Sequence, residues 1–339
     1  ITSFSVDHLE HYVNGQWVSV QEHDNLSDGL KSIVDQTGVS AICDKVVSEY
    51  ITIPCGHCIE CLKDRGQQWT NRCMLEYATD VQNAYFVSLT YRDENLPVTY
   101  YADPSTGEAF PAYTLDKKHV QDFLKRVRKY YFGSGRGTLR YYIAGEYGPS
   151  TLRPHYHCIM FGLPLDDLVQ SPNPQYYNSA AMDKLWPYGF HQISPLQPNM
   201  IAYTCHYVTG KLDPESYELY DLHNMQRPFN VQSCKPSIGR RWYDDHKDEV
   251  TELLTNPSYK ISLSMEDKGY TFPPPKYFEY LFEKEGADLD QLKKFRREKS
   301  ADLLDAELSQ TNLSYGELLA AKERTLLSKY SKMLKRDGI

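Results

Sequence analysis

Apolar residues in the middle of the chain follow two periods, one typical of strands and the other typical of helices. The segment NAYFVSLTY, residues 83–91, has the composition of a buried strand, and residues 138–146 and 155–162 are two further predicted strands. Only eight residues separate the last two, few enough for an antiparallel hairpin. A helix over 180–186 and a short strand over 189–193 are predicted next.

The clearest helix is TLDKKHVQDFLKRVRKYYFG, residues 114–133, which follows a loop rich in proline and glycine. Its apolar stripe consists of Val120, Phe123, Leu124, Val127 and Tyr131. Thr114 is the expected N-terminal cap and Gly133 the expected end of the helix. Two other helices are predicted, one from Leu62 directly after a cysteine cluster and one beginning near Asn199.

The order strand, helix, strand, strand, helix, strand predicts an α+β fold. We expect a ferredoxin-like or split βαβ antiparallel sheet with helices on one face, leaving the other face free for a ligand. This domain should cover residues 82–215. The rest of the chain is divided into an extension of unknown role (1–42), a Cys-rich element and helix (43–81), an accessory segment packing on the domain (216–283) and a helical C-terminal tail (284–339).

Composition narrows the classes of function. No apolar run approaches the roughly 20 residues of a membrane span, so we expect a soluble protein without membrane partners. The net charge of −8 argues mildly against a bulk polyanion binder. Local basic clusters such as residues 125–129 can override the net charge, or can be ordinary solvated faces.

Two histidines in RPHYHCIMFG are candidate metal ligands. His155 and His157 share one face of the predicted strand, while Tyr156 points to the other. Glu146 ends the preceding strand and can lie beside them across the hairpin, giving two imidazoles and one carboxylate with open positions for substrate oxygens. Coincidence is the alternative, since roughly 0.36 such histidine pairs are expected by chance.

The cysteine cluster PCGHCIEC is a stronger signal, because about 0.004 such triplets are expected by chance. Thiolates at this spacing indicate a structural zinc site or, less often, an iron–sulfur cluster. We predict a structural Zn²⁺ site with the ligands Cys43, Cys55, Cys58 and Cys61. His57 or Cys73 can substitute for one of them, and free buried thiols are the alternative.

Tyr203 and Tyr207 lie four residues apart on the helix predicted near Asn199, so their rings share one face. Lys211 continues that face if the helix extends past Gly210. The spacing alone carries no weight, because about 2.3 such tyrosine pairs are expected by chance.

Taken together, these segments resemble the replication initiators of small single-stranded DNA bacteriophages (microviruses, gokushovirus-like), which are HUH-type rolling-circle endonucleases. The resemblance covers residues 54–284, and the first forty-odd residues do not match the pattern. It depends on the order of PCGHCIEC, FVSLTYRDENLP, DFLKRVRKYY, AGEYG, RPHYHCIMFG, IAYTCHYVTGK, KPSIGRRWY and PPPKYF.

The resemblance implies an HUH nuclease fold and metal-dependent, site-specific nicking and rejoining of single-stranded DNA through a 5′-phosphotyrosine intermediate. His155 and His157 would hold a catalytic Mg²⁺ or Mn²⁺, with Glu146 as the expected third ligand. Tyr203 and Tyr207 would be the nucleophiles, and Lys211 would add positive charge near the tyrosinate or the phosphate.

The expected partners are single-stranded DNA at a replication origin and a host polymerase and helicase, and the expected location is the cytoplasm of the bacterial host. Two rival functions fit parts of the pattern. One is a non-catalytic, zinc-containing DNA-binding or regulatory protein, and the other is a zinc hydrolase built on the histidine pair. Replacing Tyr203 and Tyr207 by phenylalanine separates them from a nickase, which alone would lose its activity.

Overall fold

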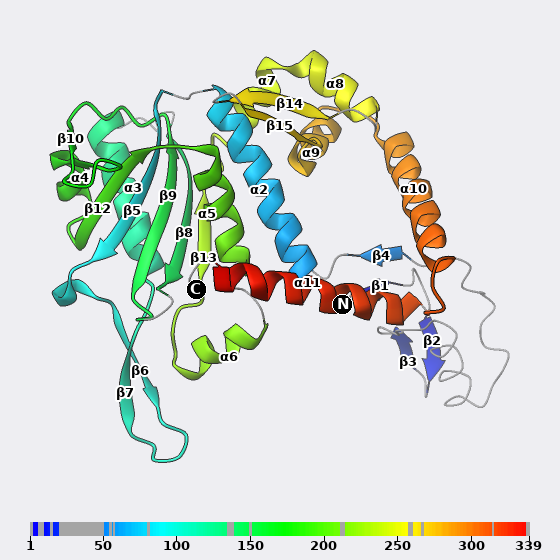
Figure 1. Ribbon diagram of the computed structural model, residues 1–339, viewed down its shortest axis with the longest axis horizontal. Helices are drawn as coiled ribbons and strands as arrows, with labels where there is room; N and C mark the ends of the chain where they lie inside the picture. The colour runs from blue at the N-terminus through cyan, green and yellow to red at the C-terminus, as the bar shows by residue number, and fades with distance from the viewer. Residues whose placement is uncertain are drawn as a thin grey trace. The chain divides into compact units, whose positions relative to one another are not determined.

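The chain divides into two compact units, one formed by Leu62–Ser300 and the other by Ile1–Cys61 together with Ala301–Gly338. Figure 1 shows the elements in a computed structural model. The structure describes residues 3–5, 10–13, 16–19, 51–53, 56, 58–79, 82–133, 139–148, 151–210, 214–256, 260–265, 268–313 and 315–336.

A seven-stranded sheet forms the centre of the larger unit, and every pair of neighbouring strands in it is antiparallel. Its order is β10 (Leu168–Gln170), β11 (Tyr177–Ser179), β12 (Gly189–Pro195), β5 (Ala84–Tyr91), β9 (Pro154–Phe161), β8 (Arg140–Tyr147) and β13 (Phe229–Gln232). Helix α3 (Lys117–Phe132) connects β5 to β8, and β9 lies between these two strands. The predicted α+β fold with a split βαβ sheet is therefore confirmed in its main features.

Both faces of the sheet carry helices, which corrects the expectation of helices on one face only. Alternate residues of β5 (Val87, Leu89 and Tyr91) pack in a core with α3 and α4 (Ala180–Leu185). The opposite face packs against α2 (Ile59–Thr79) and α5 (Pro198–Gly210) in a second core (Figure 1). The sequence places apolar residues on several sides of α2, so this helix is buried between the sheet and further elements.

This second face is covered along only part of its length. The core residues Ile159 and Phe161 lie at the covered end of β9, whereas His155 and His157 at the other end are half-buried. On β5, Ser88 and Thr90 are half-buried in the same way. The uncovered end of the face is therefore partly accessible from solvent.

Helix α3 begins three residues after the expected cap. Asp116 is the N-terminal cap, and its carboxylate accepts hydrogen bonds from the backbone amides of Lys118 and His119. The Thr114 hydroxyl instead accepts a hydrogen bond from the backbone amide of Gln226. Gly133 ends the helix as predicted, at a φ of 63° that favours glycine.

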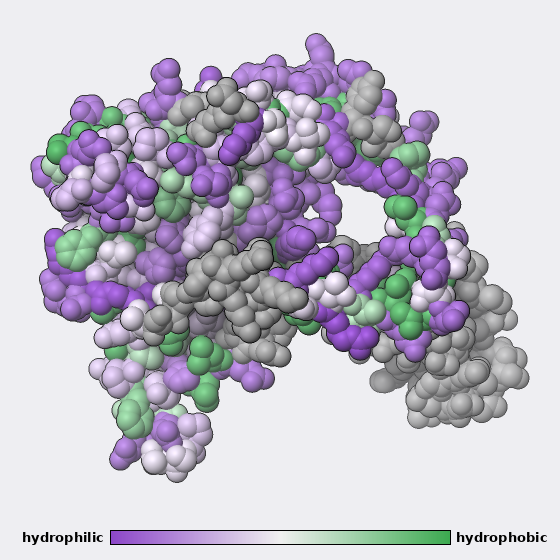
Figure 2. All heavy atoms as spheres, viewed as in Figure 1, coloured by the Kyte–Doolittle hydropathy of each residue, from purple (hydrophilic) through white to green (hydrophobic). Residues whose placement is uncertain are grey.

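The proline- and glycine-containing segment before α3, predicted as a loop, contains a β-hairpin. Strand β6 (Val98–Ala102) pairs with β7 (Ala109–Tyr113) after a short 3₁₀ helix, η1 (Asp93–Asn95). Both strands are largely exposed, so they lack the apolar alternation that indicates a half-buried strand. Figure 2 shows apolar residues among polar ones along this projecting hairpin.

The accessory segment that follows α5 packs on α2 within the same unit. Its elements are α6 (Pro214–Leu222), α7 (Arg240–Asp245), α8 (Lys247–Thr255), β14 (Ile261–Met265), β15 (Lys268–Phe272) and α9 (Lys276–Lys284). Trp242 and Phe278 join the core that contains Cys73 of α2. The Arg72 guanidinium lies between the rings of Trp69 and Tyr277, with its Cζ 4.2 and 4.0 Å from their centroids.

The remaining elements lie near the two ends of the chain. Strand β1 (Ser3–Ser5) pairs with β4 (Ile51–Ile53), and β2 (Glu10–Val13) pairs with β3 (Gln16–Ser19). The C-terminal region is helical as expected, with α10 (Asp290–Leu308) and α11 (Tyr315–Arg336). Within the described part of the chain, no helix is both long enough and apolar enough to cross a membrane.

Candidate active site

The hairpin of β8 and β9 brings the three predicted metal ligands together. Glu146 is paired with His155 in the antiparallel register, and His157 lies two residues further along β9 on the same face. The Nε2 atoms of His155 and His157 lie 2.9 and 2.7 Å from the same Glu146 oxygen, Oε1. Strand periodicity and hairpin register therefore produce one cluster from residues separated in sequence.

The Glu146 carboxylate is fully buried. Burial raises the pKa of Glu146, but the hydrogen bonds and the charge of His155 and His157 outweigh it and hold this pKa below its ordinary value. Its second oxygen, Oε2, has no hydrogen-bond partner among the described residues. Glu146 is therefore an ionised ligand at neutral pH with one oxygen still unsatisfied.

The contacts of His155 indicate a cation at this position. Its Nδ1 lies 3.2 Å from the carbonyl oxygen of Arg153, which can only accept, so Nδ1 carries a proton. Its Nε2 also faces an acceptor, Glu146 Oε1. The ring thus requires either a second proton or a metal ion at Nε2.

His157 is held from two sides. The Ser88 hydroxyl lies 3.2 Å from its Nδ1, and the ring of Phe86 stacks on it at a centroid distance of 5.3 Å. Such partners fix the orientation of a ligating imidazole. Ser88 and Phe86 are not evident from motif spacing alone, although Ser88 is a polar interruption in the otherwise apolar run YFVSL.

These residues fit a divalent metal ion. The ligand atoms of Glu146, His155 and His157 lie within 4.8 Å of one another, and no other group of this kind occurs in the described part of the chain. The histidine side chains are 22% and 16% exposed, so further ligands can approach from solvent. Two imidazoles and a carboxylate suit several divalent metals, and the donor set does not select one of them.

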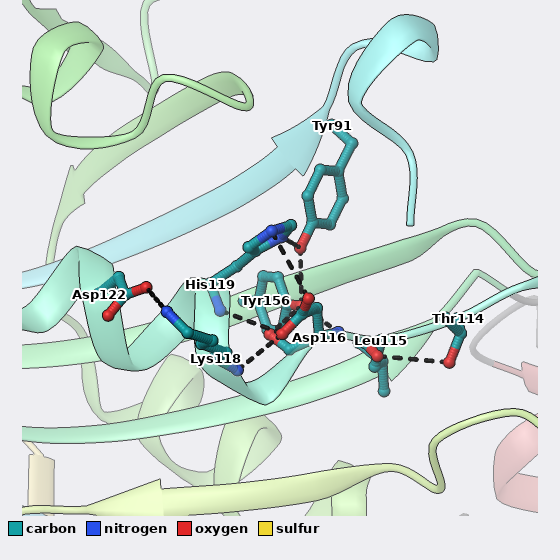
Figure 3. Close-up of polar contacts among 8 residues, drawn as sticks. All are labelled: Tyr91, Thr114, Leu115, Asp116, Lys118, His119, Asp122 and Tyr156. Atoms are coloured by element: carbon teal, nitrogen blue, oxygen red, sulfur yellow. Dashed lines mark hydrogen bonds and ion pairs between the residues drawn. The ribbon is translucent and has the colours of Figure 1, made fainter. Parts of the chain in front are cut away.

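Tyr156, between the two histidines, anchors β9 from the opposite face of the sheet (Figure 3). Its hydroxyl donates to the backbone carbonyl of Asp116, accepts from the backbone amide of that residue, and lies 2.9 Å from the hydroxyl of Tyr91. Burial raises the pKa of Tyr156, so this hydroxyl remains protonated. The N-terminus of α3 is thereby tied to the strand that carries the candidate ligands.

One predicted nucleophile lies beside the cluster. The exposed Tyr203 on α5 has its ring edge-on to that of His157, with the centroids 5.8 Å apart. Tyr207 belongs to the same helix, one turn further on, but its side chain lies outside the described residues, as does Lys211.

The predicted zinc site lies mostly outside the described residues, which exclude Cys43, Cys55 and His57. Cys58 and Cys61 are half-buried at the start of α2. Cys73 is wrong as a substitute ligand, because it lies about 18 Å further along the helix and is fully buried in the core. Burial also raises the pKa of the Cys73 thiol well above its ordinary value.

Comparisons with known proteins agree with this geometry. Residues 84–212, from the start of β5 to just beyond α5, match the family described as replication-associated protein ORF2. Replication-associated protein ORF2 of Spiroplasma virus 4 is 30% identical over 283 residues, which cover 81% of this chain and 82% of the relative.

Two other relatives are more distant. Replication-associated protein VP4 of Bdellovibrio phage phiMH2K is 24% identical over 75% of this chain and 76% of its own length. Replication-associated protein ORF4 of Chlamydia phage 1 is 27% identical over 47% of this chain and 38% of its own length. No solved structure gives a significant match. The chain therefore belongs to the replication-associated protein family of small single-stranded DNA phages.

Proposed function

We propose that this protein initiates rolling-circle replication by nicking and rejoining single-stranded DNA at a phage origin. The observation that carries the proposal is the cluster of Glu146, His155 and His157 with the ring of Tyr203 against it, in a member of a replication-associated protein family. We assign the nuclease to residues 82–215.

Glu146, His155 and His157 would hold one divalent ion, Mg²⁺ or Mn²⁺. When bound, the ion supplies a Lewis acid for a phosphate oxygen of the DNA and offsets negative charge that develops there. The protein contributes orientation: Ser88 and the Arg153 carbonyl fix the two imidazole rings through Nδ1. Tyr156 anchors their strand from the other face.

Tyr203 or Tyr207 would be the nucleophile. The phenolic oxygen forms a bond to the scissile phosphorus, the bond from phosphorus to the 3′ oxygen breaks, and the phenolic proton passes to solvent while the leaving 3′ oxygen takes up a proton. The reverse reaction reseals the strand without an external energy source. With two tyrosines on one helix, the second can cleave the regenerated origin while the first still holds the old end. Lys211 would add positive charge near the reacting oxygen.

The freed 3′-hydroxyl can prime a polymerase, so a host polymerase and helicase are the expected partners and the bacterial cytoplasm the expected location. A structural Zn²⁺ held by Cys43, Cys55, Cys58 and Cys61 remains part of this proposal. The rival functions, a zinc-containing DNA-binding module and a zinc hydrolase, require no covalent link to DNA.

A covalent adduct tests the proposal. Protein is mixed with Mn²⁺ and circular single-stranded DNA of its own phage, and DNA-linked protein is sought on a denaturing gel. Variants Tyr203→Phe, Tyr207→Phe, the double variant, and the His155→Ala/His157→Ala double are compared with Tyr280→Phe, which changes an exposed tyrosine of α9.

We expect an adduct that requires metal and both histidines, disappears in the double tyrosine variant and persists in Tyr280→Phe. An adduct that survives loss of both Tyr203 and Tyr207 would contradict the assigned nucleophiles. Absence of any adduct from folded protein with authentic origin DNA would favour the binding-module function.

A further inference from the structure

A row of paired residues extends from the candidate site across the sheet to β12. Phe190 on β12 pairs with Thr90 on β5, Thr90 pairs with His155 on β9, and His155 pairs with Glu146 on β8. Directly paired residues direct their side chains to the same face of a sheet. Phe190 therefore shares the face of the candidate metal ligands, and it lies two strands, or about 10 Å, from His155.

Phe190 is unusual for an aromatic residue in the middle of a strand, because 56% of its surface is exposed. Its neighbours on β12, Gly189 and His191, are buried. It belongs to neither of the two cores of the larger unit. No packing within the described residues therefore accounts for a phenylalanine at this position.

Arg92 lies over this ring, with its guanidinium Cζ 4.9 Å from the ring centroid. Arg92 follows β5 directly and is exposed. Its side chain makes no ion pair with any described residue, whereas the nearby Arg153 is paired with Asp93 at 2.7 Å and donates to the Tyr91 carbonyl. One guanidinium at this end of the sheet is therefore available for an external anion.

We propose that Phe190 and Arg92 bind the DNA strand next to the scissile phosphate, with a base stacked on the Phe190 ring and a phosphate against Arg92. This inference rests on the proposed nicking function and adds to it the residues that hold the substrate. An exposed aromatic ring beside a cation is the combination that binds single strands without reading their sequence. It also explains how a chain of net charge −8 can bind DNA, since the contact needs only local positive charge.

Binding to a labelled oligothymidine, followed by fluorescence anisotropy at several salt concentrations, tests the inference on the full-length protein. Phe190→Ala should weaken binding by about fivefold or more, because it removes a stacked base, and should leave the salt dependence unchanged. Arg92→Ala should reduce the slope of log affinity against log salt by about 0.7, the value for one phosphate contact on a single strand. Phe190→Trp should retain binding, while Phe190→Leu should not.

Helix α9 offers a matched control. Tyr280 is also 56% exposed, and the Lys284 ammonium lies 6.0 Å from its ring centroid. Tyr280→Ala and Lys284→Ala remove a similar exposed aromatic and a similar cation away from the sheet, so they should change neither affinity nor slope. The melting temperature of each variant should stay at the wild-type value, because the altered side chains are exposed.

The results separate this inference from the nicking function. Wild-type affinity and slope in Phe190→Ala and Arg92→Ala would overturn the inference, whether or not the wild-type protein forms a covalent adduct. A loss equal to that in Tyr280→Ala and Lys284→Ala would overturn it as well. Selective loss of binding, with no adduct from the wild type, would support the DNA contact while overturning the proposed nicking.

Discussion

A single buried carboxylate, Glu146, determines whether the two imidazoles beside it can hold a metal ion. An ionised carboxylate without partners is costly to bury, and here both histidines compensate its charge. Glu146→Gln keeps the size of the side chain but removes its charge.

We expect Glu146→Gln to weaken Mn²⁺ binding by about tenfold or more, since a change in a partner of the ligands alone costs that much. Isothermal titration calorimetry measures the effect. Asp93→Asn is the control, because it neutralises a carboxylate near the same end of the sheet that is 86% exposed. Equal affinities for Mn²⁺ in the two variants would remove Glu146 from the ligand set.

Ser88 acts on the candidate metal site through His157 rather than by direct ligation. Ser88→Ala removes the hydroxyl that contacts His157 Nδ1 and leaves the strand intact. Its Mn²⁺ affinity should fall about tenfold, with a melting temperature close to that of the wild type. The control is Thr90→Val, which removes the hydroxyl at the next position on this face of β5. A Ser88→Ala protein that binds Mn²⁺ as the wild type does would show that this contact has no role in ligand orientation.

Protons and metal compete for the imidazole nitrogens, which predicts a pH dependence. The pKa of Glu146 lies below its ordinary value, because the contacts with His155 and His157 outweigh the effect of burial, so this ligand stays ionised in mildly acidic solution. Histidine must lose its proton to bind metal, so Mn²⁺ affinity should fall below about pH 6.5. Affinity measured between pH 5 and pH 8 tests this, and a flat profile would contradict imidazole ligation.

At this scale the sequence predicts the ligands better than their supports. Residues two apart on a strand must share a face, so His155 and His157 converge, and the short hairpin brings Glu146 to them. The roles of Ser88 and the Arg153 carbonyl depend on which strand lies beside β9 and on the path of the backbone. Neither can be deduced from residue spacing.

At the scale of elements, a buried ion pair joins α2 to the sheet. The Arg140 guanidinium on β8 is paired with the Glu76 carboxylate on α2, and the side chains are 5% and 0% exposed. Glu76 also accepts a hydrogen bond from the backbone amide of Gly239, which ties the accessory segment to the same helix.

Arg140→Met should lower the free energy of unfolding by about 3–5 kcal/mol, because it leaves the Glu76 charge buried without a partner. Urea denaturation measures the change. The control, Arg241→Met, breaks a pair with Asp245 that is more than half exposed on both sides, and it should cost less than about 1 kcal/mol. Similar losses in the two variants would mean that burial of the Arg140–Glu76 pair has no special effect.

Elements with one buried face can be predicted from the sequence, and those without one cannot. The strands near residues 84, 140 and 154 and helix α3 bury regular apolar positions, so the sequence pattern reports them. The exposed β6–β7 hairpin has no such pattern, and its sequence predicts a loop. The shift of the α3 cap from Thr114 to Asp116 depends on Gln226, a residue far along the chain.

At the scale of the whole molecule, the account predicts two separable metal sites. The cysteine site is expected to hold zinc firmly, whereas the Glu146, His155 and His157 site is open to exchange. Purified protein should therefore contain about one zinc per chain by mass spectrometry of the elements. Cys58→Ser should lower this content, and Glu146→Gln should not. Zinc lost in Glu146→Gln but retained in Cys58→Ser would reverse the assignment.

Family membership establishes a role in replication for the chain as a whole, while the chemistry depends on a small part of the larger unit. The central claim is that a tyrosine of α5 becomes linked to DNA beside the candidate metal site. Peptide mass spectrometry of the trypsin-digested adduct tests it most directly. The account predicts that the nucleotide is attached to the peptide spanning residues 185–211, and that fragmentation places it on Tyr203 or Tyr207. Attachment to Tyr188 in the same peptide, or to any tyrosine elsewhere in the chain, would contradict the account.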